Sequence, residues 1–382
     1  MEEPELYPVG WYEGLRAVEE AAIRAGFRVL DADLRHGVPV LTVELPDNTK
    51  AAFRKLVAIL MRKGWMPVLE RSAPPASPTA PIYVPAKRPL GVIRAVRFRP
   101  SKPGSSRIPL VLFIATLATL FATGWLLSSG WPEGPWMGAL MYVGAMIAIL
   151  ATHELGHWIA ARLHGVRVTP PYFIPAPPPL TLFGTFGAFI QQKTPAPDRD
   201  ALFDIGLAGP LAGFIAALAV SFIGLPFSKI VIGPVIGVAL PYIPAYSLIA
   251  RIILSPPAGP DAHIWLHPVA FAGWTGMLVT MLNLIPAGSL DGGHIARCVL
   301  KPEAQMVLGI AASMGIVFLS LLFPGLYGGW YIPMALLALF MALSYRHPGA
   351  LNRISALSPG RKVALIIPII IFSMCILPIP LP

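Results

Sequence analysis

Residues 136–157 read WMGALMYVGAMIAILATHELGH, and no charged residue precedes the histidine at position 153. An uncharged apolar run of this length is typical of a membrane-spanning helix, which needs about 20 such residues. The run ends unusually, because His153, Glu154 and His157 stand where each ionisable side chain costs roughly 2.5–3.5 kcal/mol on insertion scales. The stretch therefore predicts a membrane helix whose buried polar groups have a compensating partner.

The spacing of these three side chains indicates what that partner is. Residues i and i+4 share one face of a helix, so His153 and His157 can bind the same metal ion. Glu154 can then act as a general base toward a water that the metal activates. The alternative is a pair of histidines packed between helices beside a salt-bridged glutamate, but three unpaired groups would cost on the order of 8–10 kcal/mol. The pattern favours an intramembrane zinc protease.

The composition indicates a membrane protein that spans the bilayer several times. Of 382 residues, 55% are hydrophobic and 13% are charged, whereas soluble domains are about 25% charged. The net charge of +10 is explained by Lys and Arg in cytoplasmic loops. Nucleic-acid binding is excluded, because the basic residues are scattered between spans. Cys298 and Cys375 are far apart and form neither a metal pair nor a disulfide framework.

Hydrophobic segments of about 20 residues define the predicted spans. A further apolar stretch, 229–254, is interrupted by Gly233, Pro234, Pro241 and Pro244, and is either re-entrant, interfacial or an additional pair of spans. The predicted fold class is an all-α polytopic membrane protein with about seven transmembrane helices, a β-hairpin-like element after the second, and a small N-terminal α+β domain. The seven segments are 108–129, 136–162, 202–224, 265–286, 304–324, 326–345 and 363–381.

Three regions follow from the change in composition along the chain. Residues 1–72 are predicted to form a soluble α+β domain, 73–107 a Pro-rich and basic linker, and 108–382 the transmembrane metalloprotease domain. Within the first region, periodicity and turn residues predict helices over 11–25 and 49–63 and strands over 27–34, 39–45 and 65–70.

The distribution of basic residues predicts the orientation of these spans. Arg94, Arg97, Arg99, Lys102 and Arg107 precede the first span, which places the N-terminal domain in the cytoplasm. No cleavable signal peptide is recognisable at the acidic N-terminus. We therefore expect a multi-pass protein of the cell membrane, in which the second and fourth spans both end toward the cytoplasm.

A third ligand is expected where the fourth span ends. Catalytic zinc takes three protein ligands and keeps one open position. Residues 283–293 read NLIPAGSLDGG, in which Pro286 and Gly288 break the helix and allow Asp291 to turn inward. The alternative for Asp291 is a helix-capping role in a loop. At the same membrane depth as the histidines, it is the predicted third ligand.

Several motifs together resemble the site-2 protease family of intramembrane zinc metalloproteases. The closest similarity is to the plant plastid ethylene-dependent gravitropism-deficient branch and its prokaryotic relatives, over about residues 108–345. The resemblance implies one Zn²⁺ per chain held by His153, His157 and Asp291, with Glu154 as the base and Asn283 hydrogen-bonding near the reacting centre. His294 is not expected to be a ligand. The motifs are HELGH (153–157), DIGLAGPLAG (204–213), HPVAFAGW (267–274) and NLIPAGSLDG (283–292).

The region after the second span is suited to hold substrate. A transmembrane substrate must be unwound, and its bare backbone groups need new partners in lipid, which a strand edge can supply. Residues 170–179 are too rich in proline for a helix, and 182–191 read as a Gly-kinked hairpin or loop. Gly184, Thr185, Phe186 and Gly187 are predicted to align the substrate, and the alternative is a surface loop with aromatic anchors.

Two other functions fit parts of this pattern. A membrane transporter or metal permease would also place histidines in the membrane and break its helices with Pro and Gly. A catalytically silent chaperone of the same fold would not need Glu154. The expected partners are a transmembrane protein substrate and the lipid bilayer, without nucleic acid, and the sequence does not indicate an oligomeric state.

Overall fold

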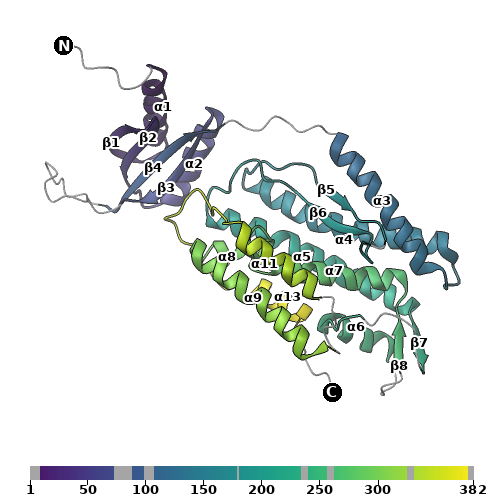
Figure 1. The fold of residues 1–382 in the computed structure, drawn as a ribbon. Helices are drawn as coiled ribbons and strands as arrows, with labels where there is room; N and C mark the ends of the chain where they lie inside the picture. The colour runs from purple at the N-terminus through teal and green to yellow at the C-terminus, as the bar shows by residue number, and fades with distance from the viewer. Residues whose placement is uncertain are drawn as a thin grey trace, which may run out of the picture. The chain divides into compact units, whose positions relative to one another are not determined.

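The computed structural model describes residues 9–72, 88–98, 107–178, 180–233, 240–255, 262–324 and 331–376. It divides into two compact units, each built from several stretches of the chain (Figure 1). Unit 1 comprises residues 1–102, 193–202 and 349–358, and unit 2 comprises 103–192, 203–348 and 359–382.

Unit 1 contains an antiparallel four-stranded sheet in the order β1-β2-β4-β3 with two helices packed against it. The β1–β2 turn has positive φ at His36 and Gly37, 52° and 77°, as a tight hairpin requires. The side chain of Asn48 accepts a hydrogen bond from the Ala51 N–H and caps the second helix. The elements are α1 (Val9–Ala25), β1 (Arg28–Arg35), β2 (Val38–Glu44), α2 (Thr49–Arg62), β3 (Trp65–Arg71) and β4 (Leu90–Arg97).

Strand β4 corrects one expectation, because it lies within the stretch 73–107 that was predicted to be linker. It pairs with both β2 and β3 and so stands inside the sheet. Its apolar residues alternate toward the core, where Ile93 and Ala95 are fully buried. The preceding proline-rich composition hid this strand, since it shares a basic, Pro-flanked neighbourhood with the linker.

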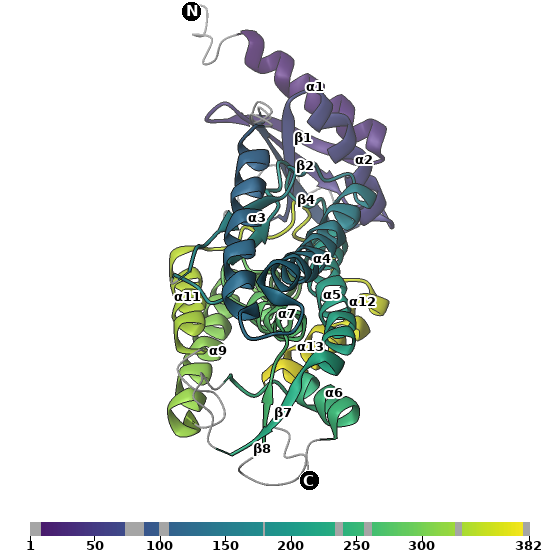
Figure 2. The same cartoon turned by 90° about the vertical axis from the view of Figure 1, so that its right-hand side faces the viewer.

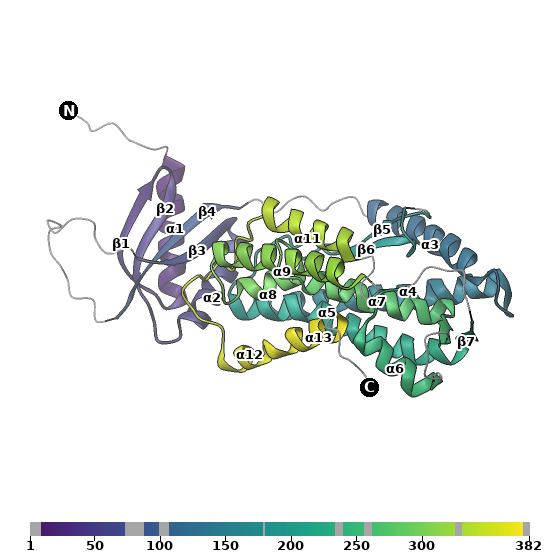
Figure 3. The ribbon, with the colours of Figure 1, turned by 60° about the horizontal axis from the view of Figure 1, so that its bottom comes forward.

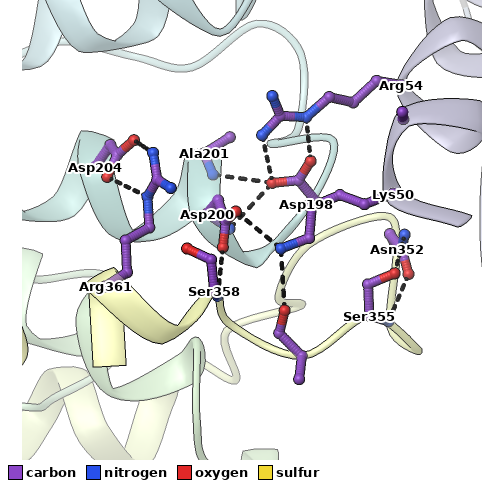
Figure 4. A network of polar contacts seen from close by, with 12 residues as sticks. Lys50, Arg54, Asp198, Asp200, Ala201, Asp204, Asn352, Ser355, Ser358 and Arg361 are labelled. Carbon is purple, nitrogen blue, oxygen red and sulfur yellow. Dashed lines mark hydrogen bonds and ion pairs between the residues drawn. The ribbon is translucent and has the colours of Figure 1, made fainter. Parts of the chain in front are cut away.

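Two distant segments complete unit 1. Asp198 is fully buried, and it binds Arg54 of α2 and accepts from the N–H groups of Asp200 and Ala201 (Figure 4). Lys50 binds Asp200 at 2.8 Å. The remaining contacts add residues 351–353 to the outer edge of β3, where the Leu69 N–H donates to the Leu351 carbonyl at 3.0 Å. Unit 1 therefore differs from the contiguous domain expected from composition.

Unit 2 contains five helices that are long and apolar enough to cross a membrane, counted over the described residues. The expected count of seven is not confirmed. Two of the predicted spans are shorter helices, α7 (Pro268–Leu284) and α11 (Tyr331–Ser344). The five are α3 (Arg107–Ser128), α4 (Gly134–Leu163), α5 (Arg199–Gly224) continued by the 3-10 turn η1 (Leu225–Phe227), α9 (Pro302–Leu322), and α12 (Pro359–Ala364) with α13 (Ile366–Ile376).

Helix α7 is the central helix of unit 2. In Figure 2 it lies among α3, α4, α11 and α13, all of which contact it. Trp274, Met277 and Leu278 are among its buried residues, and most of its length is covered by protein. Because a helix surrounded by protein has no lipid thickness to match, 17 residues suffice.

Three smaller elements complete unit 2. Strands β5 (Tyr172–Pro175) and β6 (Thr185–Phe189) form the antiparallel hairpin expected after the second span. The stretch 229–254, for which the sequence left several alternatives, contributes a strand and a short helix, and that strand pairs with β8 (Figures 1 and 2). Residues 234–239 of that stretch lie outside the described part of the chain. The elements are β7 (Lys229–Ile232), α6 (Pro244–Leu254), β8 (Ala262–Trp265) and α8 (Asp291–Arg297).

Candidate metal centre

Helix α4 presents the three ionisable residues of the HELGH motif to the interior of unit 2. His153, Glu154 and His157 are 7%, 4% and 7% exposed. The two imidazoles lie edge to face with centroids 4.8 Å apart, as the i, i+4 spacing requires. Their Nε2 atoms are 3.1 Å apart, so both nitrogens point to one position.

Asp291, the first residue of α8, completes this group. Its Oδ2 lies 3.3 Å from Nε2 of His153 and its Oδ1 lies 3.2 Å from Nε2 of His157. In a tetrahedral zinc site with bonds of roughly 2.0 Å, donor atoms lie about 3.3 Å apart. This group therefore places each imidazole nitrogen at about the spacing of tetrahedral ligands from one of the two carboxylate oxygens, and one ligand atom from each residue lies within 4.8 Å of the others. Among the described residues it is the one cluster of three or more His, Cys, Asp or Glu that could hold a metal ion.

A backbone carbonyl fixes the orientation of His157. Its Nδ1 lies 2.7 Å from the carbonyl oxygen of Ile205. A carbonyl can only accept, so Nδ1 carries the proton and Nε2 keeps its lone pair for a metal. This is the outer-shell arrangement usual for metal-binding histidines.

Glycines on α5 allow that helix to approach the imidazoles closely. A Cβ added at Gly209 would lie 2.0 Å from Nε2 of His157, and one at Gly213 would lie 2.9 Å from Nδ1 of His153. On α4, a Cβ at Gly156 would lie 2.4 Å from the carbonyl oxygen of Ala208. These glycines were not among the predicted site residues, although small residues at helical spacing in an apolar helix are a recognised signal of close helix packing.

The two glycines that follow Asp291 have a similar cause. A Cβ at Gly292 would lie 2.1 Å from the carbonyl oxygen of Leu284, and one at Gly293 would lie 2.4 Å from that of Gly288. The first turn of α8 therefore lies directly against the backbone that leaves α7. Any larger residue would push Asp291 away from the histidines.

Glu154 lies beside the three donors, and one oxygen of its carboxyl group is free to accept a hydrogen bond. Its Oε2 is buried and has no hydrogen-bond partner in the described structure. The backbone N–H of Ile190 interacts with the same carboxyl group. A buried carboxylate with an unused oxygen is expensive unless another group binds it, and a water held between it and a metal would supply that partner.

Asn283 in the last turn of α7 faces the same place. Its Nδ2 lies 3.4 Å from Nε2 of His153. It lines a cavity of about 70 Å³ that His153, Glu154, Phe186 and Gly187 also line. Its amide can therefore reach a group that occupies this cavity.

The four hairpin residues predicted to align substrate fall into two pairs. Phe186 and Gly187 line the cavity. Gly184 instead faces α3, since its carbonyl accepts from Oγ1 of Thr119 at 2.7 Å. Thr185 is buried and its hydroxyl donates to the Ile174 carbonyl within the hairpin. The structure thus brings the first pair to the metal centre and uses the second to hold the hairpin.

His267 lies apart from the metal centre and binds Glu133. Nδ1 of His267 accepts from the Val269 N–H, so its Nε2 donates to Glu133 at 2.6 Å. Burial alone would raise the pKa of Glu133, but hydrogen bonds from its backbone and from His267, with the charge of Lys229, lower the pKa below its ordinary value. This contact joins the starts of α4 and α7.

His294 pairs with His347, and their ring nitrogens are 2.6 Å apart. Burial lowers the pKa of His294 to about 4. Burial, with His294 and Arg297 nearby, lowers the pKa of His347 to about 3. Both rings are therefore neutral at physiological pH, and one N–H donates to the other nitrogen.

Comparison with known proteins agrees with this geometry. The chain is 32% identical over 252 residues to the probable zinc metalloprotease EGY1, chloroplastic, of Oryza sativa subsp. japonica, which is 63% of this chain and 41% of that protein. EGY1 of Arabidopsis thaliana is 32% identical over 249 residues, 63% of this chain and 43% of that protein. EGY2 of the same species is 33% identical over 195 residues, 50% of this chain and 34% of that protein.

The chain thus spans about two fifths of the length of the first two of these relatives. No solved structure matches it significantly. The model of "Peptidase family M50" matches residues 141–322, which contain both histidines, Glu154, Asn283 and Asp291. Over this stretch the chain therefore matches peptidase family M50, in line with the site-2 protease resemblance of its motifs.

Proposed function

We propose that this chain is an intramembrane zinc metalloprotease that hydrolyses peptide bonds within or near the transmembrane segments of membrane proteins. The observation that carries the proposal is that the Nε2 atoms of His153 and His157 lie 3.1 Å apart and face the two oxygens of the Asp291 carboxylate, at 3.3 Å from Oδ2 and 3.2 Å from Oδ1 respectively. Ordinary ion pairing would not need two imidazoles with their Nε2 atoms aimed at one carboxylate. The names of the relatives support zinc as the metal.

The residues divide the chemistry of hydrolysis among them. Zn²⁺ held by the three donors would act as a Lewis acid that makes water acidic near neutral pH and polarises a carbonyl. Glu154 accepts a proton from the water as its oxygen attacks the carbonyl carbon. Glu154 then gives this proton to the leaving nitrogen as the C–N bond breaks. Asn283 binds the oxygen that gains negative charge.

The hairpin supplies partners for an unwound substrate. Strands β5 and β6 form a two-stranded sheet, so one edge of β6 is free of strand partners among the described residues. Phe186 and Gly187 of β6 line the cavity beside Glu154. A substrate strand added to this edge would satisfy its backbone groups in an apolar environment.

The location is part of the proposal. Five helices with the length and hydropathy of membrane spans support a membrane-embedded enzyme. The basic residues before the first span favour a cytoplasmic N-terminal domain in the cell membrane. The relatives named above are chloroplastic.

Measuring zinc content and cleavage of a single-span substrate tests this function. The variant Glu154→Gln should retain zinc and lose cleavage, because it keeps all three donors and lacks the base. The variant Asp291→Ala should lose both. The matched control is Glu303→Gln, the same change at an exposed position in the first turn of α9, which should keep both. Full cleavage by Glu154→Gln would reject the assignment, and metal flux that survives this change would favour a transporter.

A second experiment tests the role of the hairpin. Phe186→Pro removes a backbone N–H from β6 and should impair cleavage while leaving zinc bound. Leu182→Pro is the control, since Leu182 is exposed and lies outside both strands. Equal cleavage by the two variants would rule out strand addition at β6.

A further inference from the structure

The third ligand is held differently from the two histidines. His153 and His157 stand on α4, a helix of 30 residues. Asp291 begins α8, which has seven residues and no side-chain hydrogen bond at its N-cap. The chain reaches it through Pro286 and Gly288, where Gly288 has a φ of +49°. The position of Asp291 therefore depends on the neighbouring segments that contact this loop and this short helix.

Helix α9 contacts the loop that leads to Asp291. Gln305 is 3% exposed, and its Nε2 donates to the carbonyl oxygen of Gly288 at 3.2 Å. Four residues further along the same helix, a Cβ at Gly309 would lie 2.9 Å from the carbonyl oxygen of Pro286. Figures 1 and 3 show α8, α9 and α11 side by side. On α11, the carbonyl oxygen of Met341 would lie 2.4 Å from a Cβ at Gly288.

The segment after α11 forms hydrogen bonds with α8. The ring of His347, which is 4% exposed, shares a hydrogen bond of 2.6 Å with the ring of His294. Nε of Arg297 donates to the backbone carbonyl of His347 at 3.1 Å. These two contacts fall three and six residues after Asp291, so they fix both turns of the short helix.

Simple core packing would not need polar side chains at these positions. Burying an amide or an imidazole costs free energy unless each is hydrogen-bonded, and an apolar side chain of similar size would avoid that cost. The side chain of Gln305 is hydrogen-bonded to the loop before Asp291, and that of His347 is hydrogen-bonded to the helix that Asp291 begins. Outer-shell groups of this kind orient ligands and typically change metal affinity 10- to 100-fold when lost.

We propose that Gln305 and His347 are positioning residues that hold Asp291 at the distance from His153 and His157 that binds the metal. The inference rests on the proposed metal centre and goes beyond it, because neither residue contacts the metal position. Their role is to set the geometry of the third ligand.

Zinc affinity and the absorption spectrum of the Co²⁺-substituted protein test this proposal without requiring activity. Gln305→Met keeps the size of the side chain and removes the donor, and His347→Phe keeps a ring and removes its nitrogens. Each should weaken zinc binding 10- to 100-fold in competition with a chelator and should shift the Co²⁺ bands, since the carboxylate moves. His347→Asn restores a hydrogen-bonding group and should recover part of the affinity.

Ser313→Ala is the matched control, because Ser313 is buried on the same helix and its hydroxyl donates to the Gly309 carbonyl of that helix. It should leave affinity and spectrum unchanged. Wild-type affinity and spectrum in both Gln305→Met and His347→Phe would overturn the proposal. If either variant fails to fold, the other decides the outcome. A wild-type protein that binds no zinc would instead reject the metal centre itself.

Discussion

Two buried pairs of histidines lie in unit 2, and the difference between them shows what makes a metal site. The rings of His153 and His157 have centroids 4.8 Å apart at 74°, and those of His294 and His347 have centroids 4.5 Å apart at 86°. The ring nitrogens are 3.1 Å apart in the first pair and 2.6 Å in the second. Ring geometry alone would therefore not distinguish them.

The surrounding groups do distinguish the two pairs. Both Nε2 atoms of the first pair face the carboxylate of Asp291, one toward each oxygen at 3.3 and 3.2 Å, and this carboxylate can supply the third donor. The second pair has the guanidinium of Arg297 on the same segment, and a cation there disfavours a metal ion. We therefore expect a metal ion at the pair that faces a carboxylate, whereas the other pair forms a hydrogen bond between neutral rings.

Removing zinc should change the free energy of unfolding more than any other test that distinguishes the two histidine pairs. If zinc binds the folded protein through the first pair, as we propose, saturating zinc at about 1,000 times its Kd should raise the free energy of unfolding by about 4 kcal/mol. Asp291→Asn should abolish this gain. Thermal unfolding with and without chelator checks it, and Asp204→Asn, a carboxylate that pairs with His164, is the control that should keep the gain. An equal zinc gain in Asp291→Asn would contradict the comparison.

Glycine substitutions in helix α5 are a second way to distinguish the two histidine pairs, because glycines of this helix contact both pairs. Gly209→Ala places a Cβ 2.0 Å from Nε2 of His157 and should lower zinc affinity more than about 100-fold, beyond the usual outer-shell effect. Gly206→Ala places a Cβ 3.0 Å from Cβ of His294, which small shifts relieve, and should lower it less than about 10-fold. Chelator competition measures both.

Gly144→Ala is the control for these two changes, since a Cβ there has no atom within 4 Å. It should leave zinc affinity unaltered. The expected order of the two test variants would be refuted if Gly206→Ala proved the more damaging.

Acid titration should give the smallest effect, and it acts on the second pair. Burial holds the pKa of folded His347 at about 3, below the ordinary value of about 6.5. The unfolded chain therefore binds more protons, and stability is full above pH 6.5 and falls as the pH drops below it, by up to about 1.4 kcal/mol per pH unit. His294, Arg297 and the nearby charge of Asp291 act on the same pair.

Urea unfolding of zinc-free protein between pH 6.5 and 5.5 checks this effect. His347→Gln cannot take up the proton, so its stability should fall less steeply over that range than that of the wild type. Parallel pH profiles for the two proteins would show that His347 is not buried and neutral in the folded state.

The sequence predicted those parts of the structure that depend on local pattern. The helix that ends in His153–His157, the hairpin after it and the position of Asp291 follow from hydrophobic run length, proline placement and one helix break. Helix α7 was expected at span length because its apolar run is long, but burial by neighbouring helices removes the need to match the bilayer. That is a tertiary effect which no local pattern records.

Contacts between distant segments could not be predicted in this way. His294 and His347 are 53 residues apart, and neither lies in a motif that requires a partner. Strand β4 was hidden by its Pro-rich surroundings, although its alternation of apolar residues was visible. Gly209 and Gly213 were visible as small residues in an apolar helix, but their role appears only when the imidazoles are in place.

The composition of unit 1 has a consequence for synthesis of the protein on the ribosome. Lys50 of α2 binds Asp200, which lies 150 residues later, and the carbonyl of Ala356, which lies 306 residues later. At roughly 5–20 residues per second, translation of that interval takes on the order of 15–60 s. During this time α2 and the edge of β3 lack contacts with residues 351–356, which have not yet been synthesised. Unit 1 therefore cannot be completed until residues 349–358 have been translated, long after its sheet and helices have been made.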